Sequence, residues 1–183
     1  MVLAAGAGVR FARGGEGPHK LLVPWRGRPL VVWAIEAAVS AAVGPVWVVD
    51  GAADLSGVVP EGVSVLHNSR WEEGQATSLQ VAIEAARRAG LDAVVVGLAD
   101  QPSIPPSAWE AVASSEASIA VATYDGQRRN PVRLSAAVWD LLPTAGDEGA
   151  RSVVRRRPEL VEEVPCEGDP TDIDTREDLV RWS

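Results

Sequence analysis

Short runs of β-branched residues alternate with longer amphipathic runs along the whole chain of 183 residues. The most constraining run is Ala93-Val94-Val95-Val96-Gly97, which places no polar side chain on either face of a strand. Such a strand is buried on both faces, as in the interior of a mostly parallel sheet. Helices must then cover both sides, so the sequence predicts a three-layer α/β/α fold.

The other expected elements follow this alternation in a regular order. Strands are predicted at 2–5, 46–50, 63–66, 93–97, 118–122, 131–134 and 160–164, and helices at 29–42, 75–89, 106–114, 149–156 and 175–182. Pro29 suits the first turn of its helix, and Gly90 ends the next one. Nothing resembles a linker or a repeat, so we expect a single domain over residues 1–183. Ligands of such sheets bind outside the carboxyl ends of the strands.

Composition excludes several classes of protein. With 46% hydrophobic and 23% charged residues the chain is typical of a globular domain. Neither a run of roughly 20 apolar residues nor a signal-peptide pattern is visible, so we expect a cytoplasmic protein with no membrane partner. The formal charge of −8 argues against a nucleic-acid partner. One cysteine and two histidines exclude an internal disulfide and a Cys/His zinc cluster.

A glycine-rich stretch follows the first expected strand and ends at Lys20, the one lysine of the sequence. The other 16 basic residues are arginine, so Lys20 is a candidate for a position that requires a compact ammonium on a flexible stem. Gly6 and Gly8 allow backbone N–H groups to approach a polyphosphate closely, and Arg10 adds further donors. The stretch from Gly14 to Pro18 equally fits a flexible surface loop.

Two common nucleotide motifs are missing from this stretch. No Gly-Lys-Ser/Thr follows at the Walker A spacing. The third glycine of a dinucleotide fingerprint would fall at Phe11, which disfavours an NAD site.

Acidic residues stand where a metal ion would be held. Asp100 closely follows the apolar strand, so its carboxylate should project from the carboxyl edge of the sheet, and Asp174 or Asp172 could complete the site from the C-terminal segment. Mg²⁺ prefers a few carboxylates together with substrate phosphate oxygens. Asp100 could instead be a turn residue before Pro102, and the other two could cap the last helix.

Further polar residues have two interpretations each. Thr77 and Ser78 either cap their helix or help that helix N-terminus to bind a ligand. Arg129 and Asn130 either contact a second substrate or face solvent. The run 155–157 of three arginines is typical of a solvated helix end but could also meet an anionic partner.

Six motifs in order resemble the nucleotidyltransferases of the MobA-like type, and the resemblance covers almost the whole chain. The opening motif is Leu3-Ala4-Ala5-Gly6-x-Gly8-x-Arg10, followed by Lys20-Leu21-Leu22 and Gly27-x-Pro29-Leu30. The others are at 68–79 (Trp71, Gly74, Ser78, Leu79), 97–102 (Gly97-Leu98-Ala99-Asp100-Gln101-Pro102), 129–132, 146–151 and 172–179.

The resemblance implies a Rossmann-like nucleotidyltransferase fold and specific roles for residues. It implies nucleotide binding by eight residues: Leu3, Ala4, Ala5, Gly6, Gly8, Arg10, Lys20 and Ser78. It implies catalysis by Lys20, Arg10 and Asp100, and Mg²⁺ binding by Asp100 and Asp174, with Asp172 as the second choice. Trp71 is expected near the site, whereas His67 and Cys166 are expected to be structural.

The chain is most similar to the molybdenum cofactor cytidylyltransferase subgroup, because Ala4-Ala5-Gly6 replaces the Ala-Gly-Gly of guanylyltransferases. That subgroup implies CTP as donor, molybdopterin carrying molybdenum as acceptor and a molybdenum hydroxylase as recipient of the product. Other acceptors remain open, namely a sugar phosphate, a polyol phosphate or another phosphorylated metabolite. From other classes, an NAD(P)H-dependent oxidoreductase and a non-catalytic carrier of molybdenum cofactor also remain.

Overall fold

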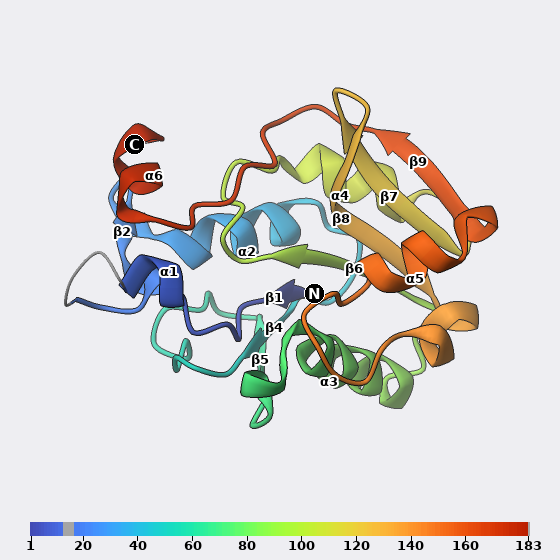
Figure 1. Cartoon of the computed structure of the whole chain (residues 1–183), viewed down its shortest axis with the longest axis horizontal. Helices are drawn as coiled ribbons and strands as arrows, with labels where there is room; N and C mark the ends of the chain where they lie inside the picture. Colours follow the sequence, from blue (N-terminus) through green and yellow to red (C-terminus); the bar gives the residue numbers. More distant parts are fainter. Residues whose placement is uncertain (13–16, 183) are drawn as a thin grey trace.

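The computed structural model describes residues 1–12 and 17–182 and has a mostly parallel sheet at its centre (Figure 1). Its seven strands lie in the order β5-β4-β1-β6-β8-β7-β9. Within the described ranges, β8 is the strand that runs antiparallel to its neighbours. The strands are β1 (Val2–Leu3), β4 (Trp47–Asp50), β5 (Ser64–His67), β6 (Ala93–Leu98), β7 (Ile119–Tyr124), β8 (Gln127–Ser135) and β9 (Val161–Pro165).

Helices cover both faces of this sheet, as predicted. Helices α2 (Leu30–Ser40) and α4 (Pro106–Ala113) pack on one face, and α3 (Gln75–Arg88) and α5 (Arg151–Arg156) pack on the other (Figure 1). The alternation of side chains along each strand divides the core in two. Val2 and Val48 join the α2/α4 side, whereas their neighbours Leu3 and Val49 join the α3/α5 side.

The order of the strands places a crevice at the carboxyl end of β1. This strand pairs with β4 on one side and β6 on the other, in both cases in parallel. The chain reaches β4 through α2 on one face and reaches β6 through α3 on the opposite face. Where connections diverge in this way, the strand ends leave an opening between them, which is where ligands of open α/β sheets bind.

Several element boundaries differ from the sequence predictions. β8 is longer than the expected 131–134 because it forms a hairpin with β7. Its register shifts opposite Val121 and Ala122, so Pro131 lies beside a bulge, where the missing N–H of proline costs no ladder hydrogen bond. β1 covers only two of its four expected residues. The expected loop from Gly14 to Pro18 falls largely on residues 13–16, outside the described ranges.

A short hairpin was not predicted and explains why α2 begins later than expected. Strands β2 (Pro24–Trp25) and β3 (Arg28–Pro29) pair with each other, so Pro29 precedes α2 as its N-cap. The remaining short elements are α1 (Val9–Ala12), η1 (Lys20–Leu22), η2 (Trp71–Glu73), η3 (Ala136–Leu141), η4 (Pro158–Leu160) and α6 (Arg176–Arg181). None of the helices in the described ranges has the length and apolar character needed to cross a membrane.

Candidate nucleotide and metal site

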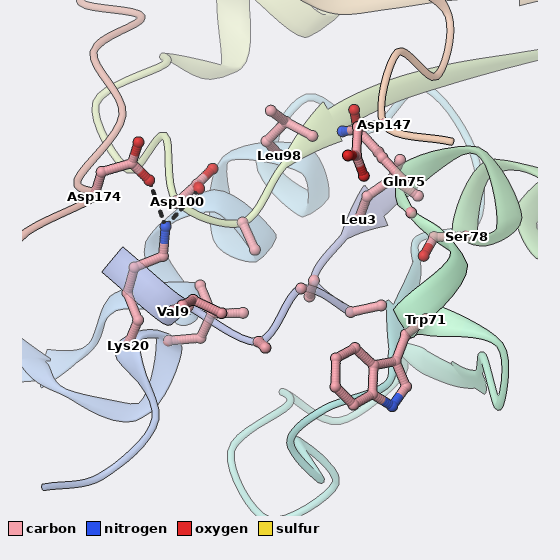
Figure 2. Close-up of a pocket in the computed structure, with 18 of the residues that line it drawn as sticks. Leu3, Val9, Lys20, Trp71, Gln75, Ser78, Leu98, Asp100, Asp147 and Asp174 are labelled. Atoms are coloured by element: carbon pink, nitrogen blue, oxygen red, sulfur yellow. Dashed lines mark hydrogen bonds and ion pairs between the residues drawn. The ribbon is translucent and has the colours of Figure 1, made fainter. Parts of the chain in front are cut away.

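A cavity of about 480 Å³ opens at the carboxyl ends of β1 and β6. Figure 2 shows three charged side chains, Lys20, Asp100 and Asp174, gathered at one end of it. The other end carries Trp71, Gln75, Ser78 and Asp147 (Figure 2). The eight residues expected to bind nucleotide all line this cavity: Leu3, Ala4, Ala5, Gly6, Gly8, Arg10, Lys20 and Ser78.

Lys20 lies between two carboxylates that come from distant parts of the chain. It is the first residue of η1, and its side chain is only 9% exposed. Its ammonium donates to Asp100 Oδ2 at 2.8 Å and to Asp174 Oδ1 at 2.9 Å. An ammonium has three N–H donors, so these two bonds leave one donor for a ligand in the cavity.

The C-terminal segment brings Asp174 to the end of β6. The backbone N–H of Ile173 donates to the carbonyl of Asp100 at 2.9 Å, and the Ile173 side chain is buried. Thr175, not Asp174, is the N-cap of α6, and it forms a capping box with Asp178. The Asp174 carboxylate is therefore free to face Lys20 and Arg10, whose guanidinium donates to Asp174 Oδ2 at 2.6 Å.

The charges at this end of the cavity stabilise one another. Burial lowers the pKa of Lys20, but the carboxylates of Asp100 and Asp174 outweigh burial and raise this pKa above its ordinary value. Burial likewise raises the pKa of Asp174, but Lys20 and Arg10 hold it below its ordinary value. The two shifts favour a charged ammonium on Lys20 beside an ionised carboxylate on Asp174 at neutral pH.

The donor set fits a single Mg²⁺ that also binds a substrate. Asp100 and Asp174 direct oxygens at the same ammonium nitrogen, so one small cation could contact both. No group of three or more possible metal-ligating side chains occurs among the described residues. Two carboxylates are sufficient where phosphate oxygens complete the coordination, which is the usual arrangement for Mg²⁺.

Asp172 lies close to this pair but differs from Asp174 in its surroundings. Its Oδ1 is buried and lacks a hydrogen-bond partner within the described part of the chain. Burial raises the pKa of Asp172, and the nearby carboxylates of Asp100 and Asp174 raise it further. Asp172 lines a second cavity, whereas Asp174 lines the first.

The glycine-rich loop presents unused backbone donors to the cavity. The backbone N–H groups of Gly6, Ala7 and Gly8 donate no hydrogen bond to any described residue. Gly8 has a φ of +63°, and a Cβ there would lie 3.1 Å from Cβ of Lys20. Glycine is thus required at position 8 both for its backbone conformation and for the close approach of the loop to the lysine.

The opposite end of the cavity is built around the start of α3. Gly74 is the N-cap residue, with a φ of +100°, and a Cβ there would lie 2.5 Å from the carbonyl group of Gly146. Thr77 and Ser78 lie one turn later and do not act as N-caps. Both hydroxyls accept from the Nδ2 group of the buried Asn68, at 2.9 Å each. The sequence did not single out Gln75 or Asp147, although both line the cavity.

A second cavity of about 660 Å³ shares Leu3, Gln75 and Leu98 with the first. Its lining includes Arg128, Arg129, Asn130, Arg151, Arg155 and Asp172. Arg128 and Arg155 form ion pairs with Glu163 and Glu148. Arg129 and Arg151 have no carboxylate partner among the described residues.

The remaining expectations concern single residues. Trp71 lines the first cavity, as expected. His67 was expected to be structural, and its Nδ1 lies 2.9 Å from Oδ1 of the buried Asp50. The cause is the parallel pairing of β4 with β5, which places these two residues opposite each other. Cys166 is half-buried, and burial raises the pKa of its thiol.

The fold and the cavity define a class of protein: an α/β protein with a glycine-rich loop, a buried lysine and an acidic pair at the carboxyl edge of its sheet. The chain belongs to the MobA-like NTP transferase family, whose domain it matches over residues 1–162. It is therefore a nucleotidyltransferase by family, and the six motifs that resembled this family led to the correct assignment.

Curated relatives and a solved structure extend this comparison over nearly the full length of the chain. Nicotine blue oxidoreductase of Paenarthrobacter nicotinovorans is 30% identical, covering 99% of this chain and 94% of its own. Purine catabolism protein PucB of Bacillus subtilis is 30% identical, covering 98% and 93%. The structure of Rv0371c from Mycobacterium tuberculosis has a TM-score of 0.82 at 27% identity, covering 99% of this chain and 94% of that one.

Proposed function

We propose that this nucleotidyltransferase transfers CMP from CTP to the terminal phosphate of a molybdopterin-type cofactor and releases pyrophosphate. One observation carries the proposal: the glycine-rich loop, the ammonium of Lys20 and two carboxylates meet in one cavity beside a second cavity lined by arginines. The choice of CTP rests on Ala4-Ala5-Gly6, which resembles the cytidylyltransferase subgroup.

The first cavity would hold the nucleotide. The loop N–H groups that lack a partner among the described residues and the exposed guanidinium of Arg10 would bind the β- and γ-phosphates. The third N–H of Lys20 would reach the α-phosphate or the leaving pyrophosphate. Trp71 and Ser78, at the far end of the cavity, would face the base and ribose.

The second cavity would hold the acceptor. It opens directly from the first, because Leu3, Gln75 and Leu98 line both. Arg129 and Arg151 lack a carboxylate partner in the described part of the chain, so their charge is available to a phosphorylated substrate. Asp172, which lies close to Asp100 and Asp174, also lines the second cavity, so an acceptor phosphate bound there would lie near the α-phosphate end of the nucleotide.

Transfer requires positioning and charge stabilisation more than covalent chemistry from the protein. An acceptor phosphate oxygen attacks the α-phosphorus in line, and the bond to the bridging oxygen breaks, so that pyrophosphate leaves with the bonding electron pair. Lys20 would stabilise the negative charge that builds between the α-phosphate and the leaving group. Asp100 and Asp174 would hold Mg²⁺, which neutralises phosphate charge when bound. An ionised phosphate acceptor needs no general base.

Pyrophosphate release tests the proposal. The protein is incubated with Mg²⁺ and each NTP in turn, with and without molybdenum cofactor. We expect release that requires both CTP and the cofactor. Release with CTP and a sugar or polyol phosphate instead would replace the acceptor but keep the enzyme class. Tight binding of the cofactor without release from any NTP would favour a carrier.

A second candidate is an NAD(P)H-dependent oxidoreductase, because one relative at 30% identity is named nicotine blue oxidoreductase. The absence of a third glycine from the loop counts against a dinucleotide site, since Phe11 stands in its place and is buried. An absorbance assay separates the two functions. The protein is incubated with NADH or NADPH and a quinonoid dye as acceptor, and oxidation of the nicotinamide would favour the oxidoreductase.

A further inference from the structure

His19 precedes Lys20 and contacts two separate parts of the nucleotide site. Its Nδ1 accepts from the backbone N–H of Leu21 at 3.3 Å, so the imidazole acts as the N-cap of η1. Its Nε2 lies 2.9 Å from the carbonyl oxygen of Gly6, 13 residues earlier in the chain. One ring therefore joins the glycine-rich loop to the turn that carries Lys20.

These two contacts determine which tautomer is present. A ring nitrogen that accepts from an N–H must be unprotonated, so Nδ1 carries no hydrogen. Nε2 then carries the ring proton and donates it to the carbonyl of Gly6. The same neutral tautomer satisfies both bonds. Burial and the nearby charge of Lys20 lower the pKa of His19, which favours this neutral ring.

The bond to Gly6 has a consequence for the neighbouring amide. In a trans peptide unit the C=O and the N–H point in opposite directions. When the Gly6 carbonyl turns towards His19, the N–H of Ala7 in the same peptide unit turns away from the ring. Ala7 lines the nucleotide cavity, and its N–H has no partner among the described residues.

We propose that His19 is a positioning residue that orients the Gly6–Ala7 peptide as a phosphate donor and fixes the turn that carries Lys20. The inference rests on the proposed function, because it assigns phosphate binding to the loop. We call this arrangement, in which His19 bonds to both Gly6 and Leu21, the His19 clasp. The close packing of Gly8 supports it, because a Cβ there would meet Cβ of Lys20 at 3.1 Å and Nε2 of His19 at 3.7 Å. The loop, the imidazole and the lysine thus form one packed unit.

Two substitutions separate the two bonds. Gln at position 19 can place an amide N–H where Nε2 donates, but it offers no acceptor at Nδ1. Asn can place its oxygen near Nδ1, but it is too short to reach Gly6. His19→Gln should therefore keep phosphate affinity while kcat falls, because the Lys20 turn loses its cap. His19→Asn should keep kcat near the wild-type value while KM for the nucleotide rises, and His19→Ala should lose both.

The experiment measures kcat and KM for CTP, the affinity for inorganic triphosphate by calorimetry, and the melting temperature. We expect His19→Ala to weaken triphosphate binding about tenfold, which corresponds to the loss of about one hydrogen bond. His67 is the other histidine of the chain and pairs with Asp50 outside the cavity, so His67→Ala is the matched control and should bind triphosphate as the wild type does.

The outcomes distinguish the clasp from the proposed function. If the wild type releases no pyrophosphate but binds triphosphate in a His19-dependent way, the clasp stands and the proposed function fails. If His19→Ala keeps wild-type kcat, KM and triphosphate affinity, the clasp is wrong. An equal loss in the Ala, Gln and Asn variants that follows their melting temperatures would overturn it in favour of a purely structural role.

Discussion

The ammonium nitrogen of Lys20 lies 2.8 Å from a carboxylate oxygen of Asp100, although 80 residues separate them in the chain. Asp174 contacts the same nitrogen across 154 residues. The site is therefore assembled from three segments, and its lysine holds the two proposed metal ligands together before any ligand binds. If the proposed function holds, binding of Mg²⁺ and nucleotide would exchange some of these contacts for phosphate contacts.

Replacing Lys20 tests whether the site requires an ammonium or only a positive charge. The guanidinium of arginine is larger and planar, and it cannot fit between two carboxylates that meet at one nitrogen. We expect Lys20→Arg to lose about 100-fold or more in kcat, and Lys20→Ala to abolish turnover. Pyrophosphate release with saturating CTP measures both.

The matched control is Arg28→Lys. It exchanges the same two residue types, in the reverse direction, within the ion pair between Arg28 and Glu36. This pair lies outside both cavities, so its variant should turn over like the wild type. The Lys20 variants should keep a folded circular dichroism spectrum. Wild-type kcat in Lys20→Arg would contradict the proposed role.

Gly6→Ala separates ligand binding from folding. A Cβ at Gly6 would have no atom within 4 Å, and the residue has no positive φ, so the free energy of unfolding should change little. The methyl group would nevertheless occupy space in the first cavity, beside the amides proposed to bind phosphate. We expect KM for the nucleotide to rise while the melting temperature stays within a few degrees of the wild-type value.

Gly57→Ala is the control for this variant, because Gly57 also has open space around it and no positive φ but lies outside both cavities. Its KM and melting temperature should both match the wild type. An unchanged KM in Gly6→Ala would exclude close approach of the nucleotide to this part of the loop.

The choice between Asp174 and Asp172 as second metal ligand can be decided by substitution with asparagine. Asp174 shares its Lys20 contact with Asp100, so Asp174→Asn should weaken the affinity for Mn²⁺, used as a probe for Mg²⁺, about tenfold or more. Asp172→Asn should leave this affinity close to the wild-type value. Electron paramagnetic resonance of Mn²⁺ in the presence of CTP measures both.

The melting temperatures of Asp172→Asn and Asp174→Asn should also differ. Asp172 has a buried oxygen without a partner in the described ranges, so its neutral replacement should keep or raise the melting temperature. Asp174→Asn should lower it, because the charge of Lys20 loses a partner. The opposite order of Mn²⁺ affinities would make Asp172 the ligand.

The sequence was sufficient for those parts of the fold that depend on local pattern. The continuous apolar run of β6 predicted a buried parallel strand, and the alternation of strands and helices predicted the layers. The hairpin of β2 and β3 was missed because each strand has only two residues, too few for a pattern of period two. The true length of β8 was missed because its first half is polar and paired only with β7.

The site was predictable where a motif carried it and not where only the tertiary structure brings residues together. Gly6, Lys20 and Asp100 stood in recognisable motifs. The imidazole of His19 had no motif of its own. Its partner Gly6 lies 13 residues earlier, and the sequence between them has neither the helical nor the strand period of apolar residues. The ion pair between Arg10 and Asp174 likewise depends on how the C-terminal segment returns to β6.

The capping box of α6 links helix stability to the position of Asp174. The Asp178 carboxylate accepts from the hydroxyl and backbone N–H of Thr175 and from the backbone N–H of Asp174. These bonds lower the pKa of Asp178 below its ordinary value of 3.8. A carboxyl group with a lowered pKa stabilises the folded state above that ordinary value, and this contribution is lost as pH falls through the lowered pKa.

We therefore expect Thr175→Ala to cost about 1 kcal/mol of unfolding free energy at pH 7, the usual value of a lost N-cap. The difference from the wild type should persist down to about pH 4 and shrink below it, where Asp178 becomes protonated in both proteins. Urea unfolding at a series of pH values measures this. Thr171→Ala is the control, because Thr171 is exposed and three residues before Asp174, and it should cost little at any pH. Equal losses in both variants would contradict a specific role for the capping box, whereas a lower kcat in Thr175→Ala alone would connect the cap to the placement of Asp174.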